Sequence, residues 1–377
     1  MRKLKLTALV LMLVMAFSQT AVYAADSEEL SELTVSQALT MAVNNNDKIK
    51  SLQESEVTYK NTVTTGRDTM LESTTNTAYV SAYKSVTEAQ LALSLLETDT
   101  KVQKEKLEYN LKSYFAQIIA AENGLVLTDK QLELTKRELD ISALRLQLGL
   151  ISQSTYDSAV YSYESAIISR DNSAATIESY YRNLNELMGQ KLDKRYSLEL
   201  ELEYAPIGDS INLTTTIAHA IENSSEIKGL ENKVYLAQFD SDTKSYQLID
   251  NNGNFTVSEY NTAKEEAKNA VSLASRNLEN AKTNIELNIR SNYDSIKTLE
   301  RTYEAKVKEL AQLQAEMAIL DTKLELGQAT QLEVDTKALS LEETEETIRS
   351  TIYDHAVKKM VLTNPNLASQ VTKETAS

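Results

Sequence analysis

Two histidines, His219 and His355, are the residues of this sequence best suited to acid–base or metal chemistry. A zinc site or a nucleophilic site places an imidazole beside a second histidine, a cysteine or a carboxylate. These histidines lie in different halves of the chain, and the sequence contains no cysteine. It also lacks the Gly-x-Ser-x-Gly, phosphate-loop and His-Glu-x-x-His patterns. The sequence therefore predicts no catalytic residue, no metal site, no cofactor and no enzyme.

Carboxylates are the other candidates, because the chain has 55 Asp and Glu residues. So many acids prevent the choice of any one pair for catalysis. Thr330 with Glu333, and Ser154 with Asp157, fit the capping box that starts a helix. Asp157 and Asp335 are interpreted as solvated first-turn acids, which the helix dipole favours. These acids therefore indicate helix starts more directly than they indicate chemistry.

The elements that carry these residues are duplicated. Leu146–Gly149 recurs as Leu324–Gly327, an offset of 327 − 149 = 178 residues, and the segment 33–52 recurs at 211–230 with the same offset. Two separate matches at one offset indicate a duplicated structural unit. Function is therefore expected in the assembled shape before any single site.

Long helices dominate the prediction, because 377 residues contain only 8 glycines and 2 prolines. A helix is predicted over 79–148, with Gly149 and Gly327 ending the long helix of each repeat. An apolar residue every seven positions predicts a seam against a neighbouring helix. The stripe comprises Leu111, Ile118, Leu125, Leu132, Leu139 and Leu146, with Ile289, Ile296, Tyr303, Leu310, Met317 and Leu324 in the second repeat.

Shorter elements surround the long helices. Alternating residues over 197–203 predict a strand with one apolar face. A Thr- and Ser-rich break is predicted over 66–77. The remaining predicted helices are 34–43, 47–65, and the return helices 155–188 and 333–362.

The predicted fold class is all-α, with two tandem repeats of long antiparallel helical hairpins and a minor strand between them. Residues 1–24 combine a basic start with a short apolar run, which is typical of a secretory signal peptide; a retained anchor is the alternative. Export to the cell envelope follows from the signal. The predicted divisions are 1–24 signal, 25–195 first repeat, 196–210 connecting strand and loop, 211–362 second repeat and 363–377 disordered tail.

The charge balance limits the partners. The net charge is −16, which argues against a nucleic-acid partner and against docking of a polybasic surface on anionic lipid.

At this point the chain resembles the TolC-like outer-membrane efflux duct family. Each family repeat opens with an Ala- and Asn-spaced helix, here Ala38, Ala42 and Asn46, and more loosely Ala220 and Asn223. Each repeat later has an apolar-Gly turn followed by a hydroxyl and an acid. The segment 184–189 is similar to the ending of the family's first repeat.

The resemblance implies a homotrimer whose twelve helical strands form a coiled-coil α-barrel. It also implies docking of the glycine tips onto a periplasmic adaptor, which couples the duct to an inner-membrane pump of the ABC type or similar. Glu333 sits where the family often narrows the pore mouth, although the capping box explains this acid equally well. The implied docking residues are Leu148, Gly149, Leu150, Ser152, Leu326, Gly327, Gln328 and Thr330.

One departure separates the chain from that family. The family inserts membrane-spanning β-strands, and the matching windows 66–77 and 246–258 hold only a turn with short arms. The transmembrane barrel is therefore expected to be reduced or absent, and membrane association stays open. An alternative function is a secreted coiled-coil structural or interaction protein of the envelope that does not conduct. A monomeric helical bundle is a third possibility.

Overall fold

The structure is a computed structural model. The predicted signal segment 1–24 and most of the predicted tail 363–377 lie outside the residues that it describes. Among the described residues of that segment, Leu367 is buried and Asn366 accepts a hydrogen bond from the backbone N–H of Ser225. The described residues are 30–208, 211–249, 256–364 and 366–367.

In the described part of the first half, one short strand and four helices precede the connection to the second half. Thr34 and Asn46 cap the first two helices through their side-chain oxygens, as the sequence predicts for such residues. The elements are β1 (Glu32–Thr34), α2 (Val35–Asn45), α3 (Asp47–Glu72), α4 (Asn76–Gln147) and α5 (Gln153–Met188).

The second half repeats this order of four helices, and β2 lies in the connection that precedes them. The two long helices, α4 and α8, have 72 and 69 residues, which makes each about 100 Å long. In the described part of the chain, no helix is both long and apolar enough to cross a membrane. The elements are β2 (Ser197–Glu199), α6 (Leu213–Asn223), α7 (Ser225–Ile249), α8 (Val257–Glu325) and α9 (Gln331–Thr363).

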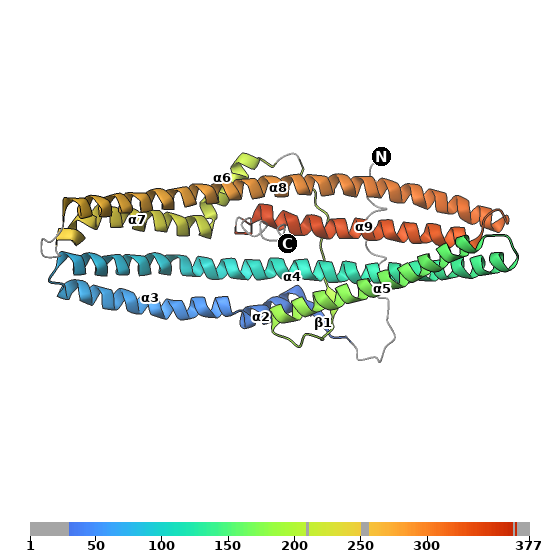
Figure 1. The fold of residues 1–377 in the computed structure, drawn as a ribbon, viewed down its shortest axis with the longest axis horizontal. Helices are drawn as coiled ribbons and strands as arrows, with labels where there is room; N and C mark the ends of the chain where they lie inside the picture. The colour runs from blue at the N-terminus through green and yellow to red at the C-terminus, as the bar shows by residue number, and fades with distance from the viewer. Residues whose placement is uncertain (1–29, 209–210, 250–255, 365, 368–377) are drawn as a thin grey trace, which may run out of the picture.

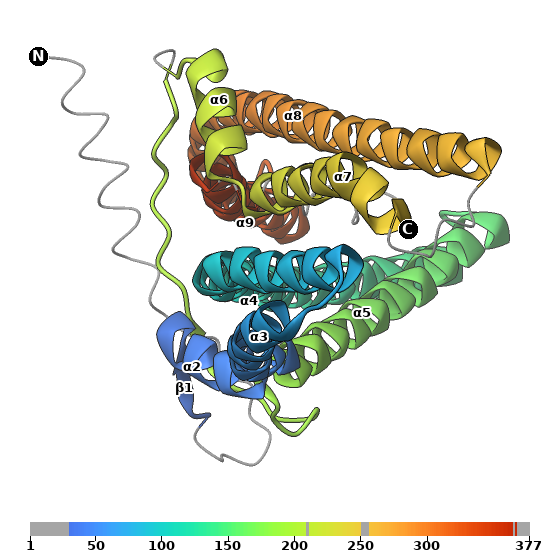
Figure 2. The same cartoon turned by 90° about the vertical axis from the view of Figure 1, so that its left-hand side faces the viewer.

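The helices form two long layers that lie side by side (Figure 1). Helices α3 and α5 pack along different stretches of α4, and α7 and α9 pack along α8 in the same way. Helix α4 also contacts both α7 and α9, so it joins the two halves (Figure 2). At the end with the glycine turns, these contacts order the helices α5, α4, α9 and α8, so α5 and α8 stand at the two edges of the combined layer and α4 and α9 lie between them.

The predicted heptad stripe is the seam of this packing. Each of its twelve positions is buried or half-buried, and Leu111, Ile118 and Ile296 are completely buried. The two main core clusters lie around the middle of the molecule, where the short helices α2 and α6 pack on the long ones. Toward the glycine turns the stripe is only half-buried, so the helices there have a thinner core.

Helix α3 is longer than the sequence predicted, because Gly66 does not break it. A Cβ atom at Gly66 would lie 2.6 Å from Cγ2 of Val86 on α4. The glycine therefore permits a close approach of two helices, and α3 continues to Glu72. The actual break covers only the short connection to Asn76, within the predicted window 66–77.

The predicted strand is shorter than the alternation over 197–203 suggested. Only Ser197–Glu199 forms ladder bonds, because its partner β1 is equally short. The two strands run parallel, with Leu33 opposite Leu198, and Leu33 is buried in the core of the first half. No pattern in the sequence predicts β1, since three residues are too few to show a period.

Candidate functional site: the two glycine turns

The two glycine turns, 148–152 and 326–330, lie at the same end of the molecule (Figure 1). The first joins α4 to α5 and the second joins α8 to α9. All eight residues that the family resemblance implied for docking are therefore gathered at one end, although they come from the two halves of the chain.

Both turns have the same backbone geometry, which satisfies the last carbonyls of the long helices. Gly149 and Gly327 have φ of 67° and 69°, and each donates its N–H to the carbonyl three residues earlier at 2.9 Å. The next N–H reaches back five residues, from Leu150 to Arg145 at 2.8 Å and from Gln328 to Lys323 at 2.7 Å. This pattern is the Schellman motif, which requires a left-handed residue at the glycine position.

The turns expose apolar side chains. Leu148, Leu150 and Leu326 are 64%, 69% and 66% exposed. A Cβ atom built on either glycine would meet no other atom within 4 Å. The glycines are therefore required by their positive φ, and the surface around them is open to a partner.

The caps that start the return helices differ between the two turns. Ser152 caps α5 by accepting the N–H of Thr155 at 3.2 Å, so this helix begins earlier than the predicted box of Ser154 and Asp157. That box is not formed. Asp157 instead accepts a hydrogen bond from Nε2 of Gln153 at 2.7 Å and remains exposed.

Glu333 completes the capping box that the sequence predicted for α9. Its Oε2 accepts the backbone N–H of Thr330 at 2.7 Å and the hydroxyl of the same residue at 3.0 Å. The hydrogen bond from the backbone N–H, and then that from the hydroxyl, lowers the pKa of the Glu333 carboxyl. The side chain is therefore ionised at neutral pH and held at the tip, close to the glycine turn.

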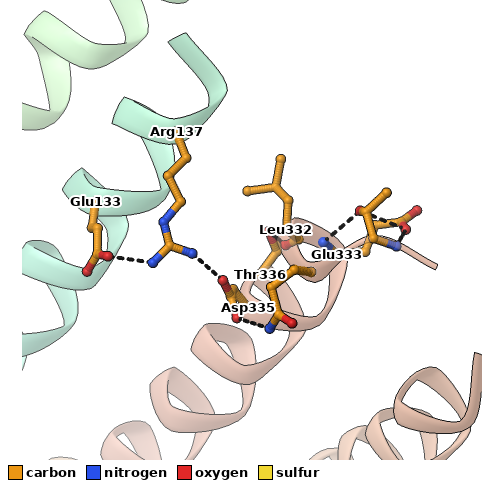
Figure 3. Close-up of polar contacts among 8 residues, drawn as sticks. Glu133, Arg137, Leu332, Glu333, Asp335 and Thr336 are labelled. Atoms are coloured by element: carbon orange, nitrogen blue, oxygen red, sulfur yellow. Dashed lines mark hydrogen bonds and ion pairs between the residues drawn. The ribbon is translucent and has the colours of Figure 1, made fainter. Parts of the chain in front are cut away.

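Asp335 does not behave as the solvated acid that the sequence suggested. The guanidinium of Arg137 on α4 donates to both Asp335 on α9 and Glu133 on α4 (Figure 3). Glu133 and then Asp335 raise the pKa of Arg137, so this cation is permanent. The pair connects the two halves near their tips, and Lys130 with Glu342 forms a second link between the same helices. A separation of 198 residues leaves no local signal for the first link.

The two histidines do not form a site. His219 is exposed on α6, whereas His355 on α9 is 1% exposed. Burial lowers the pKa of His355, and its Nε2 lies 3.5 Å from Oε1 of Glu300. Within the described residues, no group of three or more His, Asp or Glu side chains could hold a metal ion.

Glu300 anchors the connection between the halves. Its Oε1 accepts the backbone N–H of Ile207 at 2.6 Å, and Lys297 donates to its Oε2 at 3.0 Å. Burial raises the pKa of Glu300, but these hydrogen bonds outweigh it and lower the pKa overall. This cluster is structural: it fixes the connecting segment on α8 and α9.

No protein-family model matches the sequence. No curated protein matches it either. Solved structures do match over nearly the whole chain.

A membrane protein from Pseudomonas aeruginosa has a TM-score of 0.63 at 12% identity, with 93% of this chain and 96% of that chain covered. The outer membrane protein VceC from Vibrio cholerae has a TM-score of 0.63 at 11% identity, covering 88% and 95%. The Campylobacter jejuni CmeC outer membrane channel has a TM-score of 0.66 at 13% identity, covering 90% and 88%.

The chain has a TolC-like fold. The predicted all-α class and the family resemblance are thus confirmed at the level of architecture. In this TolC-like chain the tip residues predicted from the sequence lie together at one end. The ion pairs between α4 and α9 lie next to that end. In a single copy, the outer faces of α5 and α8 carry no further helix.

Proposed function

We propose that this TolC-like chain is the duct subunit of an export system in the cell envelope. Three copies would close into an α-barrel, pass substrates through its centre and dock an adaptor protein with their glycine tips. The adaptor would couple the duct to an inner-membrane pump. The chain would act as a conduit and not as an enzyme. The likeness to solved outer-membrane channels supports an outer-membrane or other envelope location.

The observation that carries the docking proposal is the paired, exposed tips. Two identical backbone turns present three exposed leucines at one end of the molecule. A monomeric structural spacer has no need for exposed apolar side chains at its helix turns, whereas a docking surface does. The links from α4 to α9 hold the two tips at a fixed spacing, which a partner could recognise.

The edge helices support assembly with further copies. On α5, Tyr161 and Ile168 are 71% and 62% exposed and lie seven residues apart, on one face of the helix. On α8, Ile319 is 59% exposed. Tyr161 lies about two to three helical turns from Gly149, and Ile319 lies about as far from Gly327. The two side chains are therefore at a similar height along the long axis of the molecule. The α5 edge of one copy can therefore pack on the α8 edge of the next.

Glu333 gains a second role in such an assembly. Three ionised carboxylates near the tips of a trimer would form a negative ring at the pore mouth, which favours cations. The capping box holds each carboxylate in place. The ring therefore adds to the structural role of Glu333 and does not replace it.

Cysteine cross-linking tests the assembly, because the natural chain has no cysteine. A variant with Tyr161→Cys and Ile319→Cys carries one thiol on each edge helix. Treatment with a short bismaleimide is expected to give covalent trimers on a denaturing gel, with no larger species, because a trimeric ring closes on itself.

Each single-cysteine variant is the matched control, because one thiol per chain allows dimers at most. A ladder beyond trimers would indicate open-ended association, and the absence of any cross-link would contradict the proposed α5–α8 contact. Capture of the adaptor by the cross-linked trimer, with the adaptor taken from the same organism, then tests docking separately.

A further inference from the structure

The chain that joins the two halves is fastened by one residue from the return helix of each repeat. This connecting segment, residues 189–208, runs from the end of α5 past β2 toward α6 (Figure 2). The hydroxyl of Tyr181 on α5 lies 2.9 Å from the carbonyl oxygen of Tyr196. The ammonium of Lys359 on α9 donates to the carbonyl of Ala205, also at 2.9 Å. Tyr181 and Lys359 occupy equivalent positions, because 359 − 181 = 178.

A glutamate on each long helix takes part in the same contacts. Glu122 on α4 and Glu300 on α8 are equivalent as well, because 300 − 122 = 178. Glu300 accepts a backbone N–H of the connecting segment, and Lys297 donates to its Oε2 at 3.0 Å. In the first repeat the position of Lys297 is occupied by Ile119, since 297 − 119 = 178. Glu122 therefore lacks this cation, and its Oε1 lies 2.8 Å from the hydroxyl of Tyr181 instead.

Tyr181 has too few hydrogens for the contacts that it makes. A phenol hydroxyl has a single hydrogen to donate. Its oxygen has an oxygen neighbour on either side, Oε1 of Glu122 at 2.8 Å and the carbonyl oxygen of Tyr196 at 2.9 Å. Because the carbonyl can only accept, both contacts are hydrogen bonds at the same time only when Glu122 carries a proton and donates it to Tyr181. The ammonium of Lys359 has three hydrogens, so the second repeat has no such limit.

The surroundings favour the protonated form of Glu122. Tyr181 is 1% exposed and Tyr196 is 3% exposed, so the shared hydroxyl lies away from solvent. Burial raises the pKa of the Glu122 carboxyl and outweighs the Tyr181 hydroxyl and Arg195, which both lower it. Burial, and then the nearby Glu122, raises the pKa of Tyr181, so the phenol keeps its hydrogen. Glu122 is therefore the member of this pair that gains or loses a proton.

Few charged groups face Glu122. Arg195 of the connecting segment lies over the ring of Tyr181, 4.2 Å from its centroid. Helix α2, which packs on α4 and α5, has no charged residue, and α4 has none within one turn of Glu122. The other charged or titratable groups at this level are Glu178 on α5, Lys194 beside Tyr196, and Glu346, Arg349 and Tyr353 on α9.

We propose that Glu122 is a proton-controlled latch for the connecting segment. With its proton, Glu122 donates to the Tyr181 oxygen, and Tyr181 gives its own hydrogen to the Tyr196 carbonyl, which fastens the segment to α5. Without its proton, Glu122 accepts the hydrogen of Tyr181, and the Tyr196 carbonyl loses its donor. The segment is thus held more tightly in acid than in alkaline solution. The inference does not rest on the duct proposal, because a single copy contains all three residues.

Amide hydrogen exchange, measured by mass spectrometry on the full chain, tests the latch. Exchange of residues 190–198 is compared at pH 4.5 and pH 8, after correction for the intrinsic pH dependence of exchange. A raised pKa gives protection that is complete below the unfolded value of 4.5 and is lost as pH rises through the folded value. Protection of the wild-type segment is expected to fall on the order of fivefold between the two conditions, the effect of one ordinary hydrogen bond.

Glu122→Gln imitates the protonated form, because its amide N–H can donate to the Tyr181 hydroxyl at any pH. Its protection at pH 8 is expected to equal that of the wild type at pH 4.5. Tyr181→Phe removes the fastening and is expected to lower protection in both conditions. Glu178→Gln is the matched control, because it removes a neighbouring carboxylate that pairs with Arg195 and leaves the shared hydroxyl unchanged. It should retain the wild-type pH dependence.

Equal protection of the wild-type segment at the two pH values overturns the proposal. A Glu122→Gln variant that keeps the wild-type pH dependence also overturns it, since another group would then carry the proton. If Glu122 had a structural role alone, the glutamine variant would lose protection in both conditions, which again contradicts the latch. Should Tyr181→Phe fail to fold, the comparison of Glu122→Gln with Glu178→Gln decides the question without it.

Discussion

Asp157 and Asp335 occupy the same position in the two repeats, yet their surroundings differ. Each accepts a hydrogen bond from the glutamine four residues earlier, Gln153 at 2.7 Å and Gln331 at 2.8 Å. Only Asp335 also meets Arg137 of the other half. Among the described residues Asp157 has no cationic partner. The duplication therefore preserves local geometry, while the position of each hairpin in the fold decides what its residues contact.

The same contrast appears further along the return helices. Ile168 on α5 is exposed, and its counterpart Glu346 on α9 is largely buried, since 346 − 168 = 178. Helix α9 packs against α4, whereas α5 stands at the edge of the layer. An apolar residue at the edge and an acid inside reverse the usual order of burial. The reversal is explained if the edge becomes an interface in an assembly.

The largest expected effect comes from removing the feature that the two tips share. Gly149→Pro with Gly327→Pro is expected to abolish adaptor binding, because proline cannot adopt a positive φ and has no N–H to donate. Leu148 and Leu326, with ψ near 0°, would also clash with the proline that follows. Surface plasmon resonance with the adaptor measures binding. Circular dichroism is expected to show that helicity is largely retained, and adaptor binding at wild-type strength would refute tip docking.

A second prediction compares two glycines in long helices. Gly66→Ala is expected to destabilise the protein by about 1–2 kcal/mol, because its Cβ would overlap Val86 and this outweighs the gain in helix propensity. Gly124→Ala is the matched control, since no atom lies within 4 Å of its Cβ, and it should stabilise by about 0.5–1 kcal/mol. Urea unfolding measures both. A destabilised Gly124→Ala with a stable Gly66→Ala would contradict the packing described.

A third prediction concerns the buried acid of the second repeat. Burial raises the pKa of Glu346 from 4.5 to about 6. Between pH 4.5 and about pH 6, the carboxyl of Glu346 therefore keeps its proton in the folded protein and loses it in the unfolded chain. The resulting stability is complete below pH 4.5 and is lost as pH rises through 6. Glu346→Gln is expected to remove this decline and to stabilise the protein at pH 7 by about 1 kcal/mol.

Thermal unfolding at pH 4.5 and pH 7, compared between the variant and the wild type, measures the effect. Ile168→Gln, at the equivalent position of the first repeat, is the control and should leave the pH dependence unchanged. A variant that shows the same pH dependence as the wild type would mean that Glu346 is solvated.

The smallest expected effect concerns the link between the halves. Arg137→Ala removes the pairs with Asp335 and Glu133 and is expected to lower stability only slightly, because both pairs are partly exposed to solvent. The loss should shrink as salt rises. Arg276→Ala on α8 is the control, because Arg276 has no ion pair in the described chain. Urea unfolding at low and high salt distinguishes the two variants.

Much of this fold is predictable from local sequence rules. Three features depend only on residues within one turn or one heptad, so they can be predicted from the sequence alone. They are the glycine turns, the Thr330 cap with Glu333, and the heptad seam. Contacts between distant segments left no such trace: Arg137 with Asp335, and Leu33 opposite Leu198, depend on how the hairpins pack. The sequence also predicts a break at Gly66 for the same reason, since its partner Val86 lies on another helix.

The mass of the purified protein in solution tests the central claim most directly. Light scattering, with and without detergent, measures it without any label or variant. The account predicts a trimer, because the edge helices carry exposed apolar side chains that a single copy leaves uncovered. A monomer in both conditions would contradict the duct and would favour a coiled-coil protein of the envelope that does not conduct.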